Sequence, residues 1–243
     1  MVSDAPEAAF QIRHNTEPGT SLIAGFASFG LAGVVAADFL VDQLALTEMG
    51  HVVASNLPAF TPFENGTPRH HSRLFSRDDL DITVLVNELF IPDWAGNSFA
   101  QSILQWGDDH AIEEITVLSG VPLSHVRHDV FSIATTDYQS TRLTGSGVEP
   151  MASGSLTGVN AGLMARGIDS PLRTGLLVTP VHSQVPDVAA AIRLVETVEQ
   201  LYGLDIDSTP LEAFAADVDQ YYRDLAARID AAEEEQVDDR MYL

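Results

Sequence analysis

Short apolar runs alternate with amphipathic segments along most of the 243-residue sequence, and this alternation limits the possible folds more than any other feature. Ser21–Phe26 has the pattern of a buried strand, and a glycine-containing turn separates it from an apolar helix over about residues 31–46. Alternating strands and helices favour one α/β domain over residues 1–232, with a mostly parallel central sheet flanked by helices on both faces. Further strands are expected at residues 51–55, 69–75, 81–87, 114–119, 130–135 and 174–179, and a mobile glycine-rich loop at 145–158.

Helix start and stop signals are clearest in the second half of the chain. Pro186 is expected to begin a helix that ends at Gly203, because proline suits the first turn and glycine the left-handed C-terminal cap. Thr209–Glu212 matches a capping box with proline at the first helical position, and the apolar stripe of that helix continues to about Ala232. The acidic segment that follows, 233–243, is expected to be a solvated, flexible tail. Two more helices are expected, one over Val159–Arg166 and one capped by Asn97, with Phe99, Ile103 and Trp106 on one face.

The charge is strongly biased, because 35 acidic and only 12 basic residues give a net charge of −23. All 12 basic residues are arginine. Such a surface suits the concentrated salt of a halophilic archaeal cytoplasm, where screening lengths shrink to about 3 Å at 1 M, and the alternative is an acidic protein from an ordinary cytoplasm. Without lysine or cysteine there is no Schiff-base or P-loop lysine, no disulfide and no thiolate metal site. Nucleic-acid binding is also disfavoured, since the chain would repel phosphates.

The N-terminal residues do not resemble a signal peptide, because Asp4 and Glu7 stand where a basic region and an apolar core would be needed. Residues 18–37 carry no charge over 20 positions, which is the length of a membrane span. Glycines interrupt this stretch and its first part has strand character, so we interpret it as a buried strand, turn and helix. The expected location is the cytoplasm, without a membrane partner.

The histidines do not form a recognisable metal-binding or catalytic frame, and no cofactor is expected. His70 and His71 are adjacent, so on a strand they would point to opposite faces. His125 and His128 stand near Asp129, a trio able to bind a cation, but they match no His-Glu-x-x-His or related pattern. Loop or surface histidines are therefore the favoured interpretation.

The segment between the first buried strand and its helix stands where many α/β proteins have a nucleotide-binding turn. It runs from Gly25 to Gly33, with Ser28 and Gly30 between them, but it matches neither Gly-x-Gly-x-x-Gly nor the P-loop. The favoured interpretation is close packing of strand and helix, which glycine permits. The alternative is a weak anion-binding site made by Gly25, Ser28, Gly30 and Gly33 at the helix N-terminus.

The last three residues of the sequence, Met241-Tyr242-Leu243, are large and apolar although they follow an acidic run. No local structure requires such side chains there, so they either have no role or form a docking motif. By average composition, a hydrophobic residue before a penultimate tyrosine would end roughly one chain in a hundred by chance. The motif alone is therefore only weakly specific.

Three stretches, by their order and spacing, carry a resemblance to a known family. They are Leu22–Phe26 with Gly30–Gly33, Leu156–Met164 continuing to Gly167-Ile168, and Pro186–Ala191 with Leu201–Asp207. Over about residues 20–232 the chain resembles the proteasome assembly chaperone 2 family. The resemblance implies an α/β core similar to that of nucleoside phosphorylases. In the archaeal members it also implies homo-oligomers that assemble or engage the 20S proteasome core particle.

The resemblance also implies a role for the last three residues. Many proteasome-binding proteins end in a hydrophobic residue, a tyrosine and any third residue, and Met241-Tyr242-Leu243 is similar to that motif at each position. The implied docking place is a pocket between neighbouring α-subunits of the 20S ring. There Met241 would fill an apolar recess, the Tyr242 hydroxyl would make a hydrogen bond, and the Leu243 carboxylate would pair with a basic residue. The expected role is non-enzymatic, as an assembly chaperone or an ATP-independent activator.

An enzyme is the alternative function. Similarity to nucleoside phosphorylases would allow a phosphate or nucleoside pocket near Gly25–Gly33, with Arg69 or Arg73 as anion ligands. A shared fold does not by itself establish a shared activity. Members of the family often carry an acidic residue just after the strand that here ends at Thr179–His182, and its absence puts a ligand site there in doubt.

Overall fold

The computed structural model describes residues 8–122, 129–182, 186–211 and 213. The chain divides into two compact units, residues 1–206 and 207–243. In the second unit Thr209–Leu211 are helical, and the Asp207 carboxylate accepts a hydrogen bond from the Thr209 N–H at 3.0 Å. This helix begins one residue before the predicted first helical position. Its predicted end at Ala232 and the tail 233–243 lie outside the described residues.

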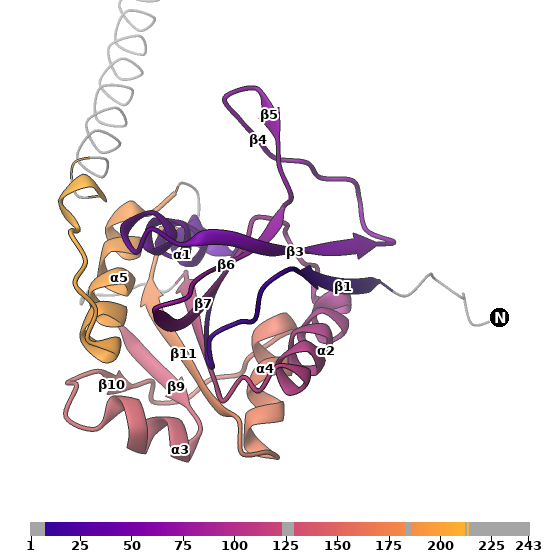
Figure 1. Cartoon of the computed structure of the whole chain (residues 1–243). Helices are drawn as coiled ribbons and strands as arrows, with labels where there is room; N and C mark the ends of the chain where they lie inside the picture. The colour runs from indigo at the N-terminus through magenta and orange to yellow at the C-terminus, as the bar shows by residue number, and fades with distance from the viewer. Residues whose placement is uncertain (1–7, 123–128, 183–185, 212, 214–243) are drawn as a thin grey trace, which may run out of the picture. The chain divides into compact units, whose positions relative to one another are not determined.

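In the described part of the first unit, nine strands form one sheet in the order β1-β3-β6-β7-β2-β8-β11-β9-β10 (Figure 1). A separate hairpin of β4 (Phe63–Glu64) and β5 (Thr67–Pro68) lies in the connection between β3 and β6. The strands of the large sheet are β1 (Ala9–His14), β2 (Ser21–Phe26), β3 (Thr47–Ser55), β6 (Ser72–Arg77), β7 (Leu80–Asn87), β8 (Glu114–Val121), β9 (Phe131–Ala134), β10 (Glu149–Pro150) and β11 (Arg173–Pro180).

The sheet is mixed, so the prediction of a mostly parallel sheet was wrong. The four adjacent strands β7, β2, β8 and β11 are parallel, whereas β1, β3, β6 and β7 pair antiparallel with one another and β9 pairs antiparallel with β11. Connection length explains the difference at β6 and β7, because Asp78 and Asp79 alone join them and a parallel pair needs a crossover of about a dozen residues. β7 is buried on both faces over most of its length, so it lacks the alternation typical of an antiparallel strand.

Helices cover both faces of the sheet (Figure 1). Packing pairs α1 (Ala32–Gln43) with α5 (Val188–Tyr202), and α2 (Asp93–Asp109) with α4 (Gly158–Ile168). Successive side chains of β2 point to opposite faces, and all six of its residues are buried between the layers. Leu22 lies in the core cluster with Phe99 and Leu163, whereas Gly25 lies against α1. The shorter elements are η1 (Phe29–Leu31), α3 (Thr136–Tyr138) and η2 (Gln139–Leu143).

Helix ends followed the sequence signals only in part. The predicted helix start at Pro186 was wrong, because α5 begins at Val188 with Asp187 as its N-cap. Its end at Gly203 was predicted correctly, and the φ of 65° there is the left-handed conformation. The predicted cap at Asn97 was wrong, because α2 begins at Asp93 directly after Pro92 and Asn97 lies inside the helix. An acidic residue in the first turn is a favourable start, since it complements the positive end of the helix dipole.

Two strands of the sheet were not predicted. β1 alternates between exposed and half-buried residues at one edge, and β10 contributes two residues within the segment 145–158, which was expected to be a loop. β3 also begins at Thr47, four residues earlier than predicted. Edge strands bury less apolar surface than central ones, so their sequences carry a weaker signal.

The uncharged stretch 18–37 folds as β2, the η1 turn and the first half of α1, which confirms its interpretation as a buried strand, turn and helix. Across the part of the chain that the structure describes, no helix combines the length and apolar character that crossing a bilayer requires.

Candidate functional site

Open α/β sheets usually bind ligands at the carboxyl ends of their parallel strands, where neighbouring connections leave in opposite directions. In this sheet that point lies between β2 and β8, because the chain continues from β2 to β3 on one side and from β8 to β9 on the other. The predicted residues Gly25, Ser28, Gly30 and Gly33 all lie at this edge: Gly25 in β2, Ser28 directly before the η1 turn, Gly30 in η1, and Gly33 at the start of α1.

Gly25 and Gly33 bring strand and helix into backbone contact. A Cβ atom on Gly25 would lie 2.1 Å from the carbonyl oxygen of Gly33, and one on Gly33 would lie 2.1 Å from that of Leu118. At Gly120, a Cβ atom would lie 2.6 Å from the carbonyl oxygen of Phe29. Only glycine permits such approaches. These contacts are those of close strand–helix packing, the interpretation favoured by the sequence.

Gly30 and Ser28 lie near the connection between β11 and α5. Gly30 has a φ of 65°, and its carbonyl oxygen accepts a hydrogen bond from the Asp187 N–H at 2.8 Å. A Cβ atom on Gly30 would lie 2.8 Å from the Cβ of Val181. The Ser28 Oγ is buried and has no hydrogen-bond partner in the described chain. Among the four residues predicted to bind an anion, Ser28 is therefore the one with an unpaired polar side-chain atom. Anion binding at this place stays a prediction.

The carboxylate of Asp187 lies beside the segment that contains Ser28 and Gly30. It was not among the residues predicted for this site. Its Oδ2 accepts hydrogen bonds from the His182 N–H at 3.0 Å and the His182 Nδ1 at 2.9 Å, and its Oδ1 accepts one from the Ala190 N–H at 2.9 Å. Burial alone would raise the pKa of Asp187, but these hydrogen bonds hold it below its usual value. An acidic group therefore does stand near residues 179–182, supplied by a helix cap. The Asp-x-x-Ala spacing after Pro186 was the signal that could have found it.

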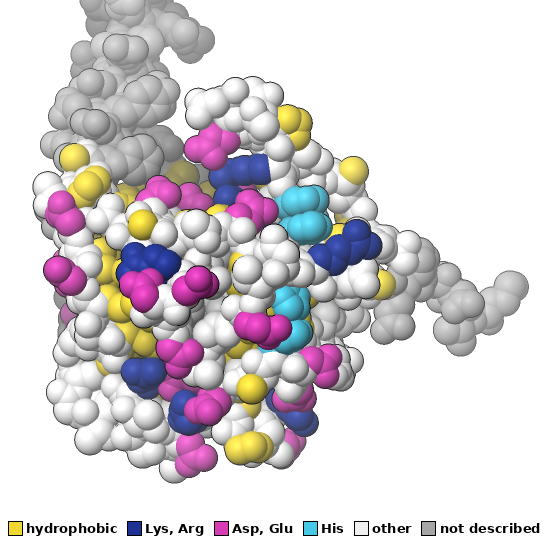
Figure 2. Space-filling model, in the orientation of Figure 1, with side chains coloured by type: hydrophobic (Ala, Val, Ile, Leu, Met, Phe, Trp, Pro, Cys, Tyr) yellow, Lys and Arg dark blue, Asp and Glu magenta, His cyan; other side chains and the backbone are white. Residues whose placement is uncertain are grey.

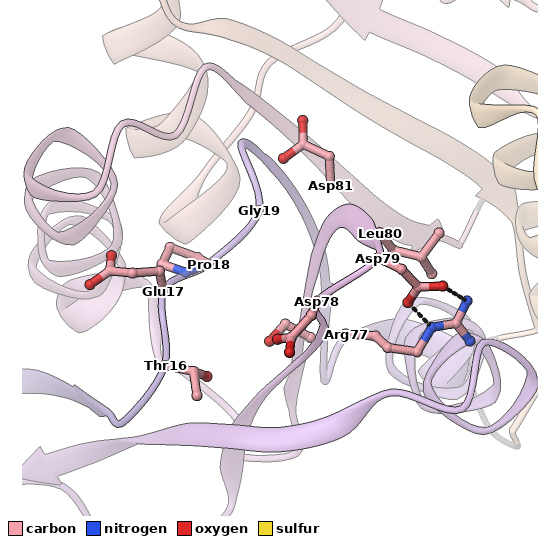
Figure 3. A pocket seen from close by; sticks show the side chains of 10 residues that line it. Thr16, Glu17, Pro18, Gly19, Arg77, Asp78, Asp79, Leu80 and Asp81 are labelled. Atoms are coloured by element: carbon pink, nitrogen blue, oxygen red, sulfur yellow. Dashed lines mark hydrogen bonds and ion pairs between the residues drawn. The ribbon is translucent and has the colours of Figure 1, made fainter.

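The opposite, amino ends of the parallel strands carry a depression of about 460 Å³ (Figure 3). Figure 3 shows the Arg77 guanidinium paired with the Asp79 carboxylate, and Asp81 accepts hydrogen bonds from the N–H and the hydroxyl of Thr20. Four of the lining residues are acidic and one is basic, so the depression attracts cations and repels phosphates. The lining residues are Thr16, Glu17, Pro18, Gly19, Ser76, Arg77, Asp78, Asp79, Leu80 and Asp81.

A fully buried carboxylate, Glu114, lies at the amino end of β8. It accepts hydrogen bonds from Arg142 Nε at 2.8 Å, Arg173 Nε at 3.1 Å and the Tyr202 hydroxyl at 2.9 Å. The Arg142 guanidinium also lies 4.2 Å from the centre of the Tyr202 ring. Because both oxygens of the carboxylate are occupied by three donors, the cluster is a structural tie between β8, η2, β11 and α5.

The two arginines considered as anion ligands are paired with carboxylates. Arg69 contacts Glu64 at 2.9 Å and Glu88 at 3.0 Å, and Arg73 contacts Asp38 at 3.3 Å and Glu88 at 3.4 Å. A phosphate or nucleoside pocket would need these guanidinium groups to face the ligand. The geometry therefore does not favour the enzyme interpretation.

No group of three or more histidine, aspartate or glutamate side chains in the described chain is arranged to hold a metal ion. His70 stacks on His51 with ring centroids 3.6 Å apart, while His71 hydrogen-bonds to the first side chain of β6. Burial lowers the pKa of both His51 and His71. His125 and His128 lie outside the described residues.

The predicted docking residues Met241, Tyr242 and Leu243 also lie outside the described residues. Docking by these three residues therefore stays a prediction from the sequence.

Comparison with known proteins gives one family and one recurring fold. The model of the PAC2 family matches residues 22–226. PbaA of Pyrococcus furiosus, described as an archaeal homolog of proteasome-assembly chaperone, superposes with a TM-score of 0.82 at 22% identity, covering 97% of this chain and 100% of that chain. PbaB of the same organism, described as an archaeal proteasome activator, gives a TM-score of 0.76 at 19% identity, covering 90% of this chain and 99% of that chain.

A protein of unknown function from Thermoplasma acidophilum gives a TM-score of 0.74 at 22% identity, covering 92% of each chain. Among curated proteins, nothing matches. At these identities the solved structures establish the fold, an α/β arrangement with a large mixed sheet between helices. The expected similarity to nucleoside phosphorylases stays a prediction.

Proposed function

Because this chain belongs to the PAC2 family, we propose that it is a non-enzymatic partner of the proteasome, acting as an assembly chaperone or as an ATP-independent activator. The family match over residues 22–226 carries the proposal. Support comes from two P. furiosus proteins with the same fold, one a homolog of a proteasome-assembly chaperone and the other a proteasome activator. The proposed location is the cytoplasm.

The proposed contact with the 20S core particle is made by Met241-Tyr242-Leu243, in a pocket between neighbouring α-subunits. Tyrosine is a frequent interface hot spot, because its ring buries a large apolar area while its hydroxyl makes a hydrogen bond. Truncating such a residue typically costs about 2 kcal/mol or more. Tyr242 is therefore the proposed dominant contributor, and residues 233–240 are the proposed tether.

Several copies of the chain are proposed to act together. Three residues make a small contact, so one segment alone would bind weakly. A homo-oligomer that presents several such segments to a ring of similar pockets gains roughly 10² to 10⁴ in apparent affinity. Light scattering in high salt is expected to report a mass several times that of one chain. A monomer at all micromolar concentrations would contradict this part of the proposal.

Gel filtration with purified 20S core particle in molar KCl tests the docking contact. Deletion of 241–243 and Tyr242→Ala are expected to abolish co-migration, while Tyr242→Phe weakens it less, because the ring is retained and only the hydroxyl is lost. Val237→Ala, an apolar truncation in the preceding acidic run, is the matched control and is expected to co-migrate like the unaltered protein. Undiminished co-migration of the 241–243 deletion would exclude this segment as the docking element.

Two activity measurements separate the two roles. An activator raises peptide hydrolysis by mature core particles, whereas an assembly chaperone raises the yield of complete particles from separated subunits. The variant Tyr242→Ala is expected to lose whichever effect the unaltered protein has. If neither measurement changes when the protein is added, the proposed function is wrong.

The purified protein is expected neither to cleave nucleosides nor to hydrolyse ATP. Arg69 is paired with two carboxylates, and the glycines at the start of α1 are in backbone contact with the strands. Turnover that survives purification and disappears in Ser28→Ala or Arg69→Ala would establish the enzyme interpretation instead.

A further inference from the structure

Two pairs of histidine rings lie in contact in the described chain, and Figure 2 shows histidine side chains in two groups on one face of the molecule. One pair joins the end of β1 to the end of α2, where His14 Nε2 lies 3.1 Å from His110 Nε2. The two residues are 96 positions apart, so the fold alone brings them together. The pair borders the acidic depression, because Glu17 lines the depression and contacts His110.

Hydrogen bonds determine which nitrogen of each ring carries a proton. His14 Nδ1 lies 2.9 Å from the carbonyl oxygen of Thr16, and His110 Nδ1 lies 3.1 Å from a carboxylate oxygen of Glu17. A carbonyl oxygen and a carboxylate can only accept, so both Nδ1 atoms must donate and carry hydrogen. When both rings are neutral, each Nε2 atom therefore has a lone pair and no proton.

Two such nitrogens 3.1 Å apart repel each other unless a positive charge lies with them. The rings are nearly perpendicular, at 87°, with centroids only 4.4 Å apart, so the nitrogens do not meet end to end as in a linear N–H···N bond. Two imidazole nitrogens that bind one metal ion at 2.0–2.1 Å lie about 2.9–3.4 Å from each other, for angles at the metal between 90° and the tetrahedral value. The observed spacing is that of two ligands of one ion.

We propose that His14 and His110 bind one divalent transition-metal ion of the zinc class through their Nε2 atoms, with water in the remaining positions. Metal-bound histidines in proteins almost always donate their other ring N–H to a carbonyl or a carboxylate, and both rings already do so here. His110 is the C-cap of α2, where the helix dipole favours a cation. The ion would tie the edge strand β1 to the end of α2.

Calorimetric titration of the full chain with Zn²⁺ tests the proposal, after removal of metals with a chelator. One ion per chain is expected, and His14→Gln and His110→Gln should each abolish this binding. Glu17→Gln should weaken it about tenfold, because it replaces the charged acceptor that orients the His110 ring by a weaker, neutral one. At a Zn²⁺ concentration one hundred times the dissociation constant, the melting temperature should rise by about 5–10 °C.

His51→Gln is the matched control. His51 belongs to the other pair, whose rings are parallel and stacked at 3.6 Å, so its nitrogens do not converge on one point. Binding of Zn²⁺ by the His51→Gln variant should equal that of the unaltered protein. Trp106 gives a second readout, since its ring lies 5.9 Å from His14 and 5.7 Å from His110, and Cu²⁺ in the site should quench its fluorescence.

Circular dichroism should show that the variants remain folded. Absence of Zn²⁺ binding by the unaltered protein would overturn the proposal and would leave a shared proton as the charge between the rings. Binding that persists unchanged in both His14→Gln and His110→Gln would also overturn it, because the ion would then lie elsewhere.

Discussion

The carboxyl and amino ends of the parallel strands differ in the kinds of residues that lie there. At the carboxyl ends of β2 and β8, where such folds usually bind ligands, glycines allow the start of α1 to touch the backbone of the strands. At the amino ends lie the acidic depression, the buried Glu114 and the His14–His110 pair. Among the described residues, polar clusters therefore lie at both ends of the strands, and the class of fold alone did not locate those at the amino ends.

The largest expected effect is at the glycine contact. Gly25→Val would place side-chain atoms where even a Cβ atom lies 2.1 Å from a carbonyl oxygen, and neither backbone can move without separating α1 from the sheet. We expect a loss of more than about 4 kcal/mol in the free energy of unfolding, measured by chemical denaturation in high salt. Gly154→Ala is the control, because a Cβ atom there meets nothing within 4 Å. A Gly25→Val protein as stable as Gly154→Ala would show that strand and helix are not in backbone contact at Gly25.

The second prediction concerns the buried carboxylate at the amino end. Glu114→Gln keeps the shape of the side chain but leaves Arg142 and Arg173 without their shared negative charge. Both guanidinium groups are about one-quarter exposed, so solvent reduces the cost, and we expect a loss of about 2 kcal/mol in the free energy of unfolding.

Glu113→Gln is the matched control for that change. Glu113 is the neighbouring carboxylate, contacts the same Arg173 at 3.3 Å and is largely exposed. Its loss should change the free energy of unfolding by no more than about 0.5 kcal/mol. Equal effects of the two substitutions would contradict the structural importance given to the buried group.

Sequence patterns predicted the parts of this molecule whose signals are local. β2, the packing role of Gly25 and Gly33, and the end of α5 at Gly203 all followed from short stretches of sequence. The directions of the strands were not predicted correctly. The short connection between the predicted strands 69–75 and 81–87 was already too short for a parallel crossover.

The polar clusters were not predictable, because their members are far apart in the chain. His14 and His110 are separated by 96 residues, and Glu114 and Tyr202 by 88. No spacing pattern within a single sequence relates such residues. His14 was also hidden because β1, on which it lies, has the weak alternation of an edge strand.

The third prediction concerns the one buried carboxylate described at the carboxyl edge. The lowered pKa of Asp187 means that its ionised form stabilises the folded state at pH values above the unfolded pKa of about 4, and this contribution is lost as the pH falls through the folded pKa. Asp187→Asn keeps a helix cap but removes the charge, so it should cost about 1 kcal/mol at neutral pH. Below pH 4 the difference between the two proteins should shrink, as thermal melts across pH would show. A difference in melting temperature between the two proteins that stays constant at all pH values would contradict the stabilising role of the Asp187 charge.

The smallest expected effect lies in the acidic depression. Asp78→Asn removes one exposed carboxylate from a chain with a net charge of −23, so in low salt the melting temperature should rise by about 1–2 °C. The gain should vanish in molar KCl, where screening is strong, and the unaltered protein itself should melt at a much higher temperature there. Asp79→Asn should give no gain, because that carboxylate is paired with Arg77. A melting temperature independent of salt would contradict both expectations.

The position of β2 in the middle of the sheet has a consequence for how the chain folds during synthesis. β2 is an early strand, all six of its residues become buried, and its partner β8 begins roughly 90 residues later. At ribosomal rates of 5–20 residues per second, an apolar strand therefore waits roughly 5–20 s for that partner. Pairings between such distant segments also slow folding itself. A protein built this way is exposed to aggregation while it is being made, and it depends on rapid protection of its first apolar strand.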